Sequence, residues 1–142
     1  MIMNEDVRWR QRFDNYLKAL RLLKLCVPES QADLSEKDQL ALIQAFEIIE
    51  QLSWKLIKDY LKYHGDVSLY SPKKVVREAF NKKIIPNGQV LVDAIEARNL
   101  TSHVYDEDTA KQLADEILHK FLPAFDGLAK QFAQYYAQDP IE

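Results

Sequence analysis

The fold of this chain is decided by the stretch Ser35–Gly65, which reads SEKDQLALIQAFEIIEQLSWKLIKDYLKYHG. Its apolar residues recur every three or four positions and cover more than one stripe, which is typical of a helix that packs against two neighbours. Ser35 and Asp38 resemble a capping box, so the helix is predicted to begin there and to run to about His64, where Gly65 stops it. The apolar positions are Leu42, Ala45, Phe46, Ile48, Ile49, Leu52, Leu56, Ile57 and Tyr60.

Helical periodicity also dominates the flanking sequence. Further helices are predicted over about residues 6–27, 71–80, 89–103 and 106–136. Ser71 and Pro72 supply an N-cap and a first-turn proline for the second of these. Pro123 lies inside the last helix and is expected to kink it, because its ring removes a backbone hydrogen bond; the tail after Tyr136 is expected to fray. Three long helices, one medium and one short predict an all-α, up-and-down four-helix bundle with an additional short helix.

The composition limits the number of domains and the classes of function that fit this chain. The 142 residues fit one domain, predicted to span residues 1–142 with a core from about 6 to 136. Only three glycines occur, with no GxGxxG or Walker-type phosphate loop, and the single cysteine, Cys26, excludes a disulfide framework. The three histidines lack metal-ligand spacing, so we expect no metal and no cofactor. Without a signal peptide or a membrane span, a cytoplasmic location is expected.

Charge is unevenly distributed along the chain. The formal net charge is −3, which argues against a strong nonspecific DNA binder, yet residues 51–100 hold nine basic and five acidic side chains. Lys55, Lys58 and Lys62 recur at helical spacing, and a second basic cluster follows over residues 73–83. This patch fits phosphates or an acidic partner, and it equally fits a solvated surface.

One polar segment stands out, Glu96–Asp106, which reads EARNLTSHVYD. Such a density of polar side chains is costly in a bundle core, since each buried polar group needs a partner. It fits a helix end that lines a cleft. On an ideal helix Arg98, Ser102 and Tyr105 share a sector of about 40–60°.

Two residues of this segment diverge around the helix axis. Arg98 and His103 are about 140° apart on an ideal helix, while Asn99 and His103 lie on one adjoining face. Arg98 and His103 therefore serve one site only if the helix ends between them, or if two copies meet at a symmetry axis, which predicts a homodimer with a shared site. Taken alone, Arg98, His103 and Tyr105 also fit a structural cluster that caps the helix and hydrogen-bonds to its neighbours.

The spacing Arg98-x4-His103-x-Tyr105 is similar to the R-x4-H-x-Y signature of the HEPN superfamily of small helical domains. Three segments in order, SWKLIKDYL at 53–61, SPKKVVREAF at 71–80 and ARNLTSHVYDE at 97–107, resemble one branch of it. That branch is the nucleotidyltransferase substrate-binding subunit family, with its HepT-like toxins. The resemblance covers about residues 8–135.

The resemblance implies a four-helix bundle with a short extra helix, a homodimer, and a separate minimal nucleotidyltransferase as partner. Members have been viewed as the substrate-binding subunit of that enzyme, and as the toxin of a toxin–antitoxin pair, a metal-independent ribonuclease. In the second view the partner silences the toxin by transferring AMP to the motif tyrosine. The implied site residues are Arg98 and His103 as catalytic, Tyr105 as modified, and Asn99, Ser102 and Asp106 as supporting residues.

Elementary chemistry is compatible with RNA cleavage. Cleavage without metal needs a base, an acid and positive charge at the phosphorus; a histidine can serve as the base or as the acid, and an arginine supplies the positive charge. Three functions stay open: a ribonuclease toxin, a noncatalytic binding subunit, and a helical dimerisation adaptor whose polar motif is structural.

Overall fold

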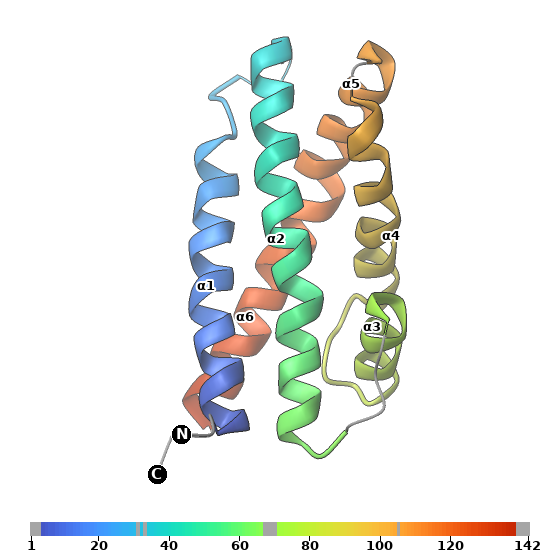
Figure 1. Ribbon diagram of the computed structural model, residues 1–142. Coiled ribbons are helices and arrows are strands. Elements are labelled where there is room, and N and C mark those ends of the chain that lie inside the picture. Colours follow the sequence, from blue (N-terminus) through green and yellow to red (C-terminus); the bar gives the residue numbers. More distant parts are fainter. Residues whose placement is uncertain (1–3, 31, 33, 67–70, 105, 139–142) are drawn as a thin grey trace.

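The computed structural model describes residues 4–30, 32, 34–66, 71–104 and 106–138, and the regular structure within these ranges is all helical. The elements are α1 (Glu5–Leu25), α2 (Glu36–Tyr63), α3 (Pro72–Asn81), α4 (Gly88–Arg98), the 3-10 helix η1 (Asn99–His103), α5 (Glu107–Glu116), the π-helical turn η2 (Ile117–Phe121) and α6 (Leu122–Gln138). α1 and α2 lie side by side, α3 and α4 stand on the other side of α2, and α6 crosses behind α2 (Figure 1). The predicted helical bundle with a short extra helix is confirmed. None of the helices in the described part of the chain is long and apolar enough to cross a bilayer.

α2 is the central helix, as its wide apolar arc predicted. It packs against α1, α3 and α5 and buries side chains on more than one of its faces. The predicted capping box is present: the Asp38 N–H donates to Ser35 Oγ at 3.1 Å, and the Ser35 N–H donates to the Asp38 carboxylate at 3.3 Å. At the far end of α2 an aromatic cluster holds three helices together, with the Trp9 and Phe132 rings 5.0 and 5.1 Å from the ring of Tyr60.

A π turn, Ile117–Phe121, ends two residues before Pro123, where the sequence predicts a kink. The Leu122 N–H donates to the carbonyl of Ile117, five residues back, so the turn is one residue wider than an α-helical turn. Pro123 has no N–H to donate. The wider turn before it accommodates this missing hydrogen bond, and the helix continues as α6. α6 then runs to Gln138, two residues beyond the predicted end, and the remaining tail lies outside the described residues.

The α-helix predicted to reach His103 is wrong in its last five residues. α4 ends at Arg98, and Asn99–His103 form a 3-10 helix. The Thr101 hydroxyl donates to the Arg98 carbonyl at 2.8 Å and the Ser102 hydroxyl to the Asn99 carbonyl at 3.4 Å. Such hydroxyls compete for carbonyls that an α-helix would use, which favours the tighter turn.

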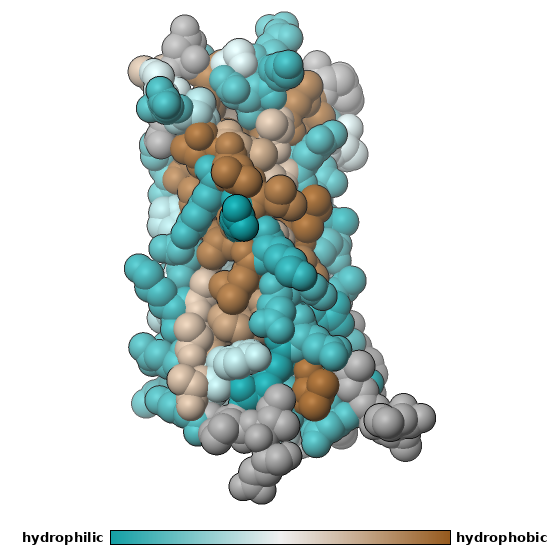
Figure 2. All heavy atoms as spheres, turned by 90° about the vertical axis from the view of Figure 1, so that its left-hand side faces the viewer, coloured by the Kyte–Doolittle hydropathy of each residue, from teal (hydrophilic) through white to brown (hydrophobic). Residues whose placement is uncertain are grey.

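The outer face of α1 is divided along its length. Figure 2 shows hydrophobic residues gathered mainly over the upper part of this face, with hydrophilic residues around and below them. The upper part belongs to the C-terminal half of α1, where Leu22 and Leu25 are 51% and 70% exposed. The N-terminal half carries Arg8 and Arg12 toward α2 instead.

Candidate functional site

Arg98 is the last residue of α4 and its side chain reaches α2. The Arg98 Nε lies 3.1 Å from Glu50 Oε2, and the arginine side chain is 39% exposed whereas the glutamate side chain is 2% exposed. The Gln51 amide, oriented so that its oxygen faces the guanidinium, accepts a hydrogen bond from Arg98 Nη2 at 2.7 Å. The guanidinium is therefore held against α2 while part of the side chain faces solvent.

Glu50 contacts Arg98 in the candidate site, and the sequence analysis did not single it out. Burial raises the pKa of this carboxyl from 4.5 to about 7, against the opposing effect of the nearby Arg98 and Lys55 charges. Its Oε2 has the Arg98 cation beside it but no aligned hydrogen-bond donor in the described part of the chain. The local signal was a carboxylate four residues after Phe46, on the apolar arc of the predicted helix, and it does not indicate which residue is the partner.

His103 lies on the surface at the end of η1. The 3-10 conformation turns about 120° per residue, so His103 remains about 120° from Arg98 around the axis. The α-helix does end between the two residues, but its end does not bring them to one face. Arg98 contacts α2 whereas His103 is exposed, so the two side chains have different surroundings within one chain.

The three supporting residues have local structural contacts. Asn99 and Ser102 are exposed and belong to the 3-10 turn. Asp106 is the N-cap of α5, where its carboxylate accepts from the Asp108 N–H at 3.3 Å and from the Thr109 hydroxyl at 2.9 Å. The predicted modification site, Tyr105, lies outside the described residues.

Apolar side chains are exposed beside the motif. Leu100 of η1 is 46% exposed and Leu40 of α2 is 47% exposed. Leu40 and Val104 together line a groove of about 390 Å³ between the first turns of α2 and α5. A segment that carries polar motif residues is therefore flanked by apolar surface, an arrangement typical of a contact region.

Comparison with known proteins places this geometry in a family. The family model "Nucleotidyltransferase substrate binding protein like" matches residues 11–134. The chain belongs to this family. The motif Arg98-x4-His103, which carries the family resemblance in the sequence, lies inside the matched region.

The chain is also similar to proteins of known sequence and structure. The chain is 33% identical over 79 residues to a probable ribonuclease HepT of Haemophilus influenzae, a match that covers 53% of this chain and 54% of the relative. The chain thus spans about half the length of this curated relative. A crystal structure of a Thermus thermophilus protein shares 28% identity at a TM-score of 0.69, covering 84% of this chain and 97% of that one.

A second solved structure shows the same fold. It is the Haemophilus influenzae protein HI0074, described as a substrate-binding domain of a nucleotidyltransferase, at a TM-score of 0.64 and 23% identity. The match covers 92% of this chain and 100% of that chain. The likeness places α1–α6 in one shared architecture.

Proposed function

We propose that this family member is a metal-independent ribonuclease, the toxin of a pair in which a separate minimal nucleotidyltransferase is the antitoxin. The observation that carries the proposal is the state of Arg98. A guanidinium fixed by a buried carboxylate and still partly open to solvent suits a phosphate oxygen better than it suits a purely structural contact. The 33% identity to a probable ribonuclease supports the proposal.

The proposed reaction uses the two motif residues in different roles. The imidazole of His103 accepts the proton of a ribose 2′-hydroxyl, and the 2′ oxygen attacks the adjacent phosphorus. The bond to the 5′ oxygen breaks, and that oxygen takes up a proton from an acid, giving a 2′,3′-cyclic phosphate and a free 5′-hydroxyl. Arg98 donates hydrogen bonds to the phosphoryl oxygens, whose negative charge increases during the attack.

A homodimer completes this site in the proposal. Helix geometry places Arg98 and His103 about 120° apart around the axis of one chain, and the reaction needs both a base and an acid. Two copies meeting at their η1 segments supply two histidines and two arginines around one axis. The exposed Leu100 and Leu40 beside the motif provide apolar surface for such a contact.

The deciding test is RNA cleavage by the purified protein in EDTA. We expect cleavage by the wild type, and a loss of about 10²–10⁴ in rate for His103→Ala and for Arg98→Ala. Matched controls are Arg77→Ala on α3 and His119→Ala in η2, which are exposed residues outside the motif and should cleave normally. Far-ultraviolet circular dichroism should show unchanged helicity in all four variants.

Two outcomes would redirect the proposal. Normal cleavage by both motif variants would refute the ribonuclease assignment. A wild-type protein that never cleaves RNA but raises the activity of its nucleotidyltransferase partner would establish the alternative, a noncatalytic substrate-binding subunit, which the family description favours.

The proposed regulation is adenylylation of Tyr105. The tyrosine oxygen attacks the α-phosphorus of ATP bound to the partner, pyrophosphate leaves, and the added phosphate competes with RNA for Arg98. After incubation with partner, ATP and Mg²⁺, intact mass should rise by one AMP unit, and peptide mapping should locate it to Tyr105. Tyr105→Phe should stay toxic and escape neutralisation. An AMP unit mapped outside residues 98–108 would contradict the assignment.

A further inference from the structure

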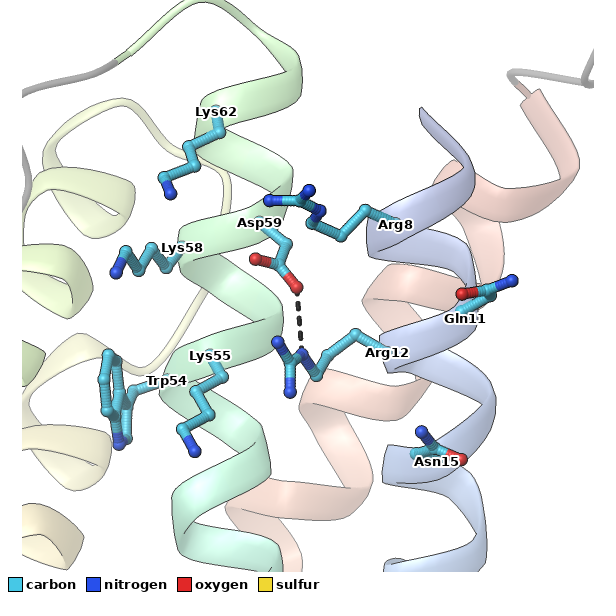
Figure 3. A pocket seen from close by; sticks show the side chains of 9 residues that line it. All are labelled: Arg8, Gln11, Arg12, Asn15, Trp54, Lys55, Lys58, Asp59 and Lys62. Atoms are coloured by element: carbon cyan, nitrogen blue, oxygen red, sulfur yellow. Dashed lines mark hydrogen bonds and ion pairs between the residues drawn. The ribbon is translucent and has the colours of Figure 1, made fainter. Parts of the chain in front are cut away.

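A groove of about 520 Å³ is lined by residues of α1 and α2, two helices that are far from His103 in the sequence. Figure 3 shows Arg8 and Arg12 reaching from α1 toward α2, and Lys58 and Lys62 projecting from α2. The residues that define this basic groove are Arg8, Arg12, Lys55, Lys58 and Lys62, with Asp59 between the two helices and Trp54 at one end.

The groove holds more positive charge than its surroundings neutralise. Arg12 Nε pairs with Asp59 Oδ2 at 2.9 Å. Arg8 and the three lysines have no carboxylate within ion-pair distance among the described residues, although each is partly withdrawn from solvent. Four cations without a carboxylate at ion-pair distance, gathered in one groove of a chain with net charge −3, indicate an anionic ligand.

The second half of the predicted basic patch behaves differently. Lys73 Nζ pairs with Glu96 at 3.0 Å, and Lys82 Nζ pairs with Asp66 at 3.2 Å and with Glu78 at 3.6 Å. The lysine side chains of these pairs are 40% and 47% exposed, as on an ordinary solvated surface. What sets the basic groove apart is that five cations line one cavity, because α1 contributes two arginines that are remote from the lysines in sequence.

Trp54 gives the groove an aromatic surface. Its indole is half-buried and packs against the core, and the Nζ atoms of Lys55 and Lys58 both lie 5.9 Å from its ring centroid. An aromatic ring flanked by cations is the combination that binds single-stranded nucleic acid, where bases stack on the ring and cations track the phosphates. An acidic peptide would use the cations but has no need of the ring.

The lysines of the basic groove lie on the same face of α2 as Gln51, the residue that contacts Arg98. At 100° per residue, Gln51, Lys55, Lys58 and Lys62 share a sector of about 60° and span about 16 Å of helix axis. Gln51 is the residue that contacts the Arg98 guanidinium. A linear ligand that follows the lysines along α2 therefore arrives at Arg98.

We propose that the basic groove binds the sugar-phosphate backbone of single-stranded RNA and leads the strand to Arg98. The direction of the strand rests on the proposed ribonuclease function, whereas binding to the groove does not. Arg8 and the three lysines contact phosphates, and Trp54 stacks on a base.

The test is equilibrium binding of an uncleavable probe, a fluorescent twelve-nucleotide single strand with 2′-O-methyl sugars, between about 50 and 200 mM salt. The test variant carries Lys58→Ala and Lys62→Ala. Its matched control carries Lys37→Ala and Lys111→Ala, which removes the same charge from exposed positions outside the groove. Because each lost phosphate contact lowers the salt slope by about 0.7 on a single strand, we expect a drop of about 1.4 for the test variant and none for the control.

Intrinsic fluorescence gives a second readout at Trp54. The only other tryptophan, Trp9, is fully buried in the core. RNA should quench the wild-type emission by stacking on Trp54, and Trp54→Phe should remove that quenching while keeping most of the affinity, since phenylalanine still stacks.

The outcomes separate this proposal from the ribonuclease proposal. Equal salt slopes for the two double variants overturn the groove proposal, even if the wild type cleaves RNA. Binding with the expected slopes supports it, even if no RNA is ever cleaved. A wild type that ignores the probe but binds an acidic protein through the same lysines also overturns it and makes the groove a protein-docking surface.

Discussion

Two arginines of this bundle, Arg10 and Arg98, each pair with a shielded carboxylate, and their surroundings differ sharply. The Arg10 side chain is 4% exposed; its Nε lies 3.0 Å from Asp6 and its Nη1 donates to the Tyr136 carbonyl at 2.8 Å. Its guanidinium also lies 4.8 Å from the Trp9 ring centroid. Arg98 pairs with a carboxylate that is more deeply buried than Asp6, but its own side chain is 39% exposed.

The difference teaches how to separate a structural ion pair from a ligand-binding one. Arg10 is enclosed by α1 and α6 and leaves no room for a ligand, so its charge serves to join the two helices. Arg98 is anchored on one side by Glu50 and Gln51 and open on the other. An anchored, half-open cation is pre-organised for an anion, because little side-chain freedom is lost on binding.

The largest effect that tests this comparison is on stability. Arg10→Met should lower the free energy of unfolding by about 3–5 kcal/mol, because it leaves the shielded Asp6 without its cation. Arg98→Met should cost about 1 kcal/mol or less at pH 6, where Glu50 is largely protonated and the arginine was half-exposed. Urea denaturation at pH 6 measures both values.

The reverse order of the two stability losses would contradict the distinction. It would make Arg98 a structural residue and weaken the proposed site. The methionine side chain keeps most of the apolar volume at either position, so the comparison isolates the charge rather than a cavity.

Features governed by neighbours in the sequence were predictable. The helix starts at Ser35 and Ser71 follow from side chains that accept hydrogen bonds from the first turn, at Asp38 and Lys74. The break of α4 after Arg98 depends on hydroxyl-to-carbonyl bonds of Thr101, which compete weakly with an α-helical turn. Helix propensity alone does not decide between two such similar geometries.

Features made by residues remote in sequence were not predictable. Glu50 and Arg98 are 48 positions apart in the printed sequence, and nothing local to either one indicates the pair. Arg8 and Arg12 join the lysines of α2 only because α1 packs against α2. The motif segment could therefore be proposed from the sequence and stays a prediction, while the contacts of Arg98 with α2 and the basic groove required the fold.

The smaller effect concerns the pH dependence that Glu50 gives to stability. The pKa of this carboxyl is about 7 in the folded protein, against 4.5 as its ordinary value. The folded state therefore binds the proton more tightly than the unfolded state, so the contribution of Glu50 is full below pH 4.5 and is lost as the pH rises through about 7. A shift of this size is worth about 3 kcal/mol across the window.

Glu50→Gln should remove this dependence, because the amide does not titrate. The difference in free energy of unfolding, variant minus wild type, should rise by up to about 3 kcal/mol between pH 4.5 and 8, as measured by urea denaturation at successive pH values. Glu47→Gln, one turn earlier on α2 at a half-exposed position, is the matched control and should follow the wild-type curve. A parallel pair of curves for Glu50→Gln and wild type would show that Glu50 is ionised throughout, and Arg98 would then resemble Arg10, a cation locked into a permanent ion pair.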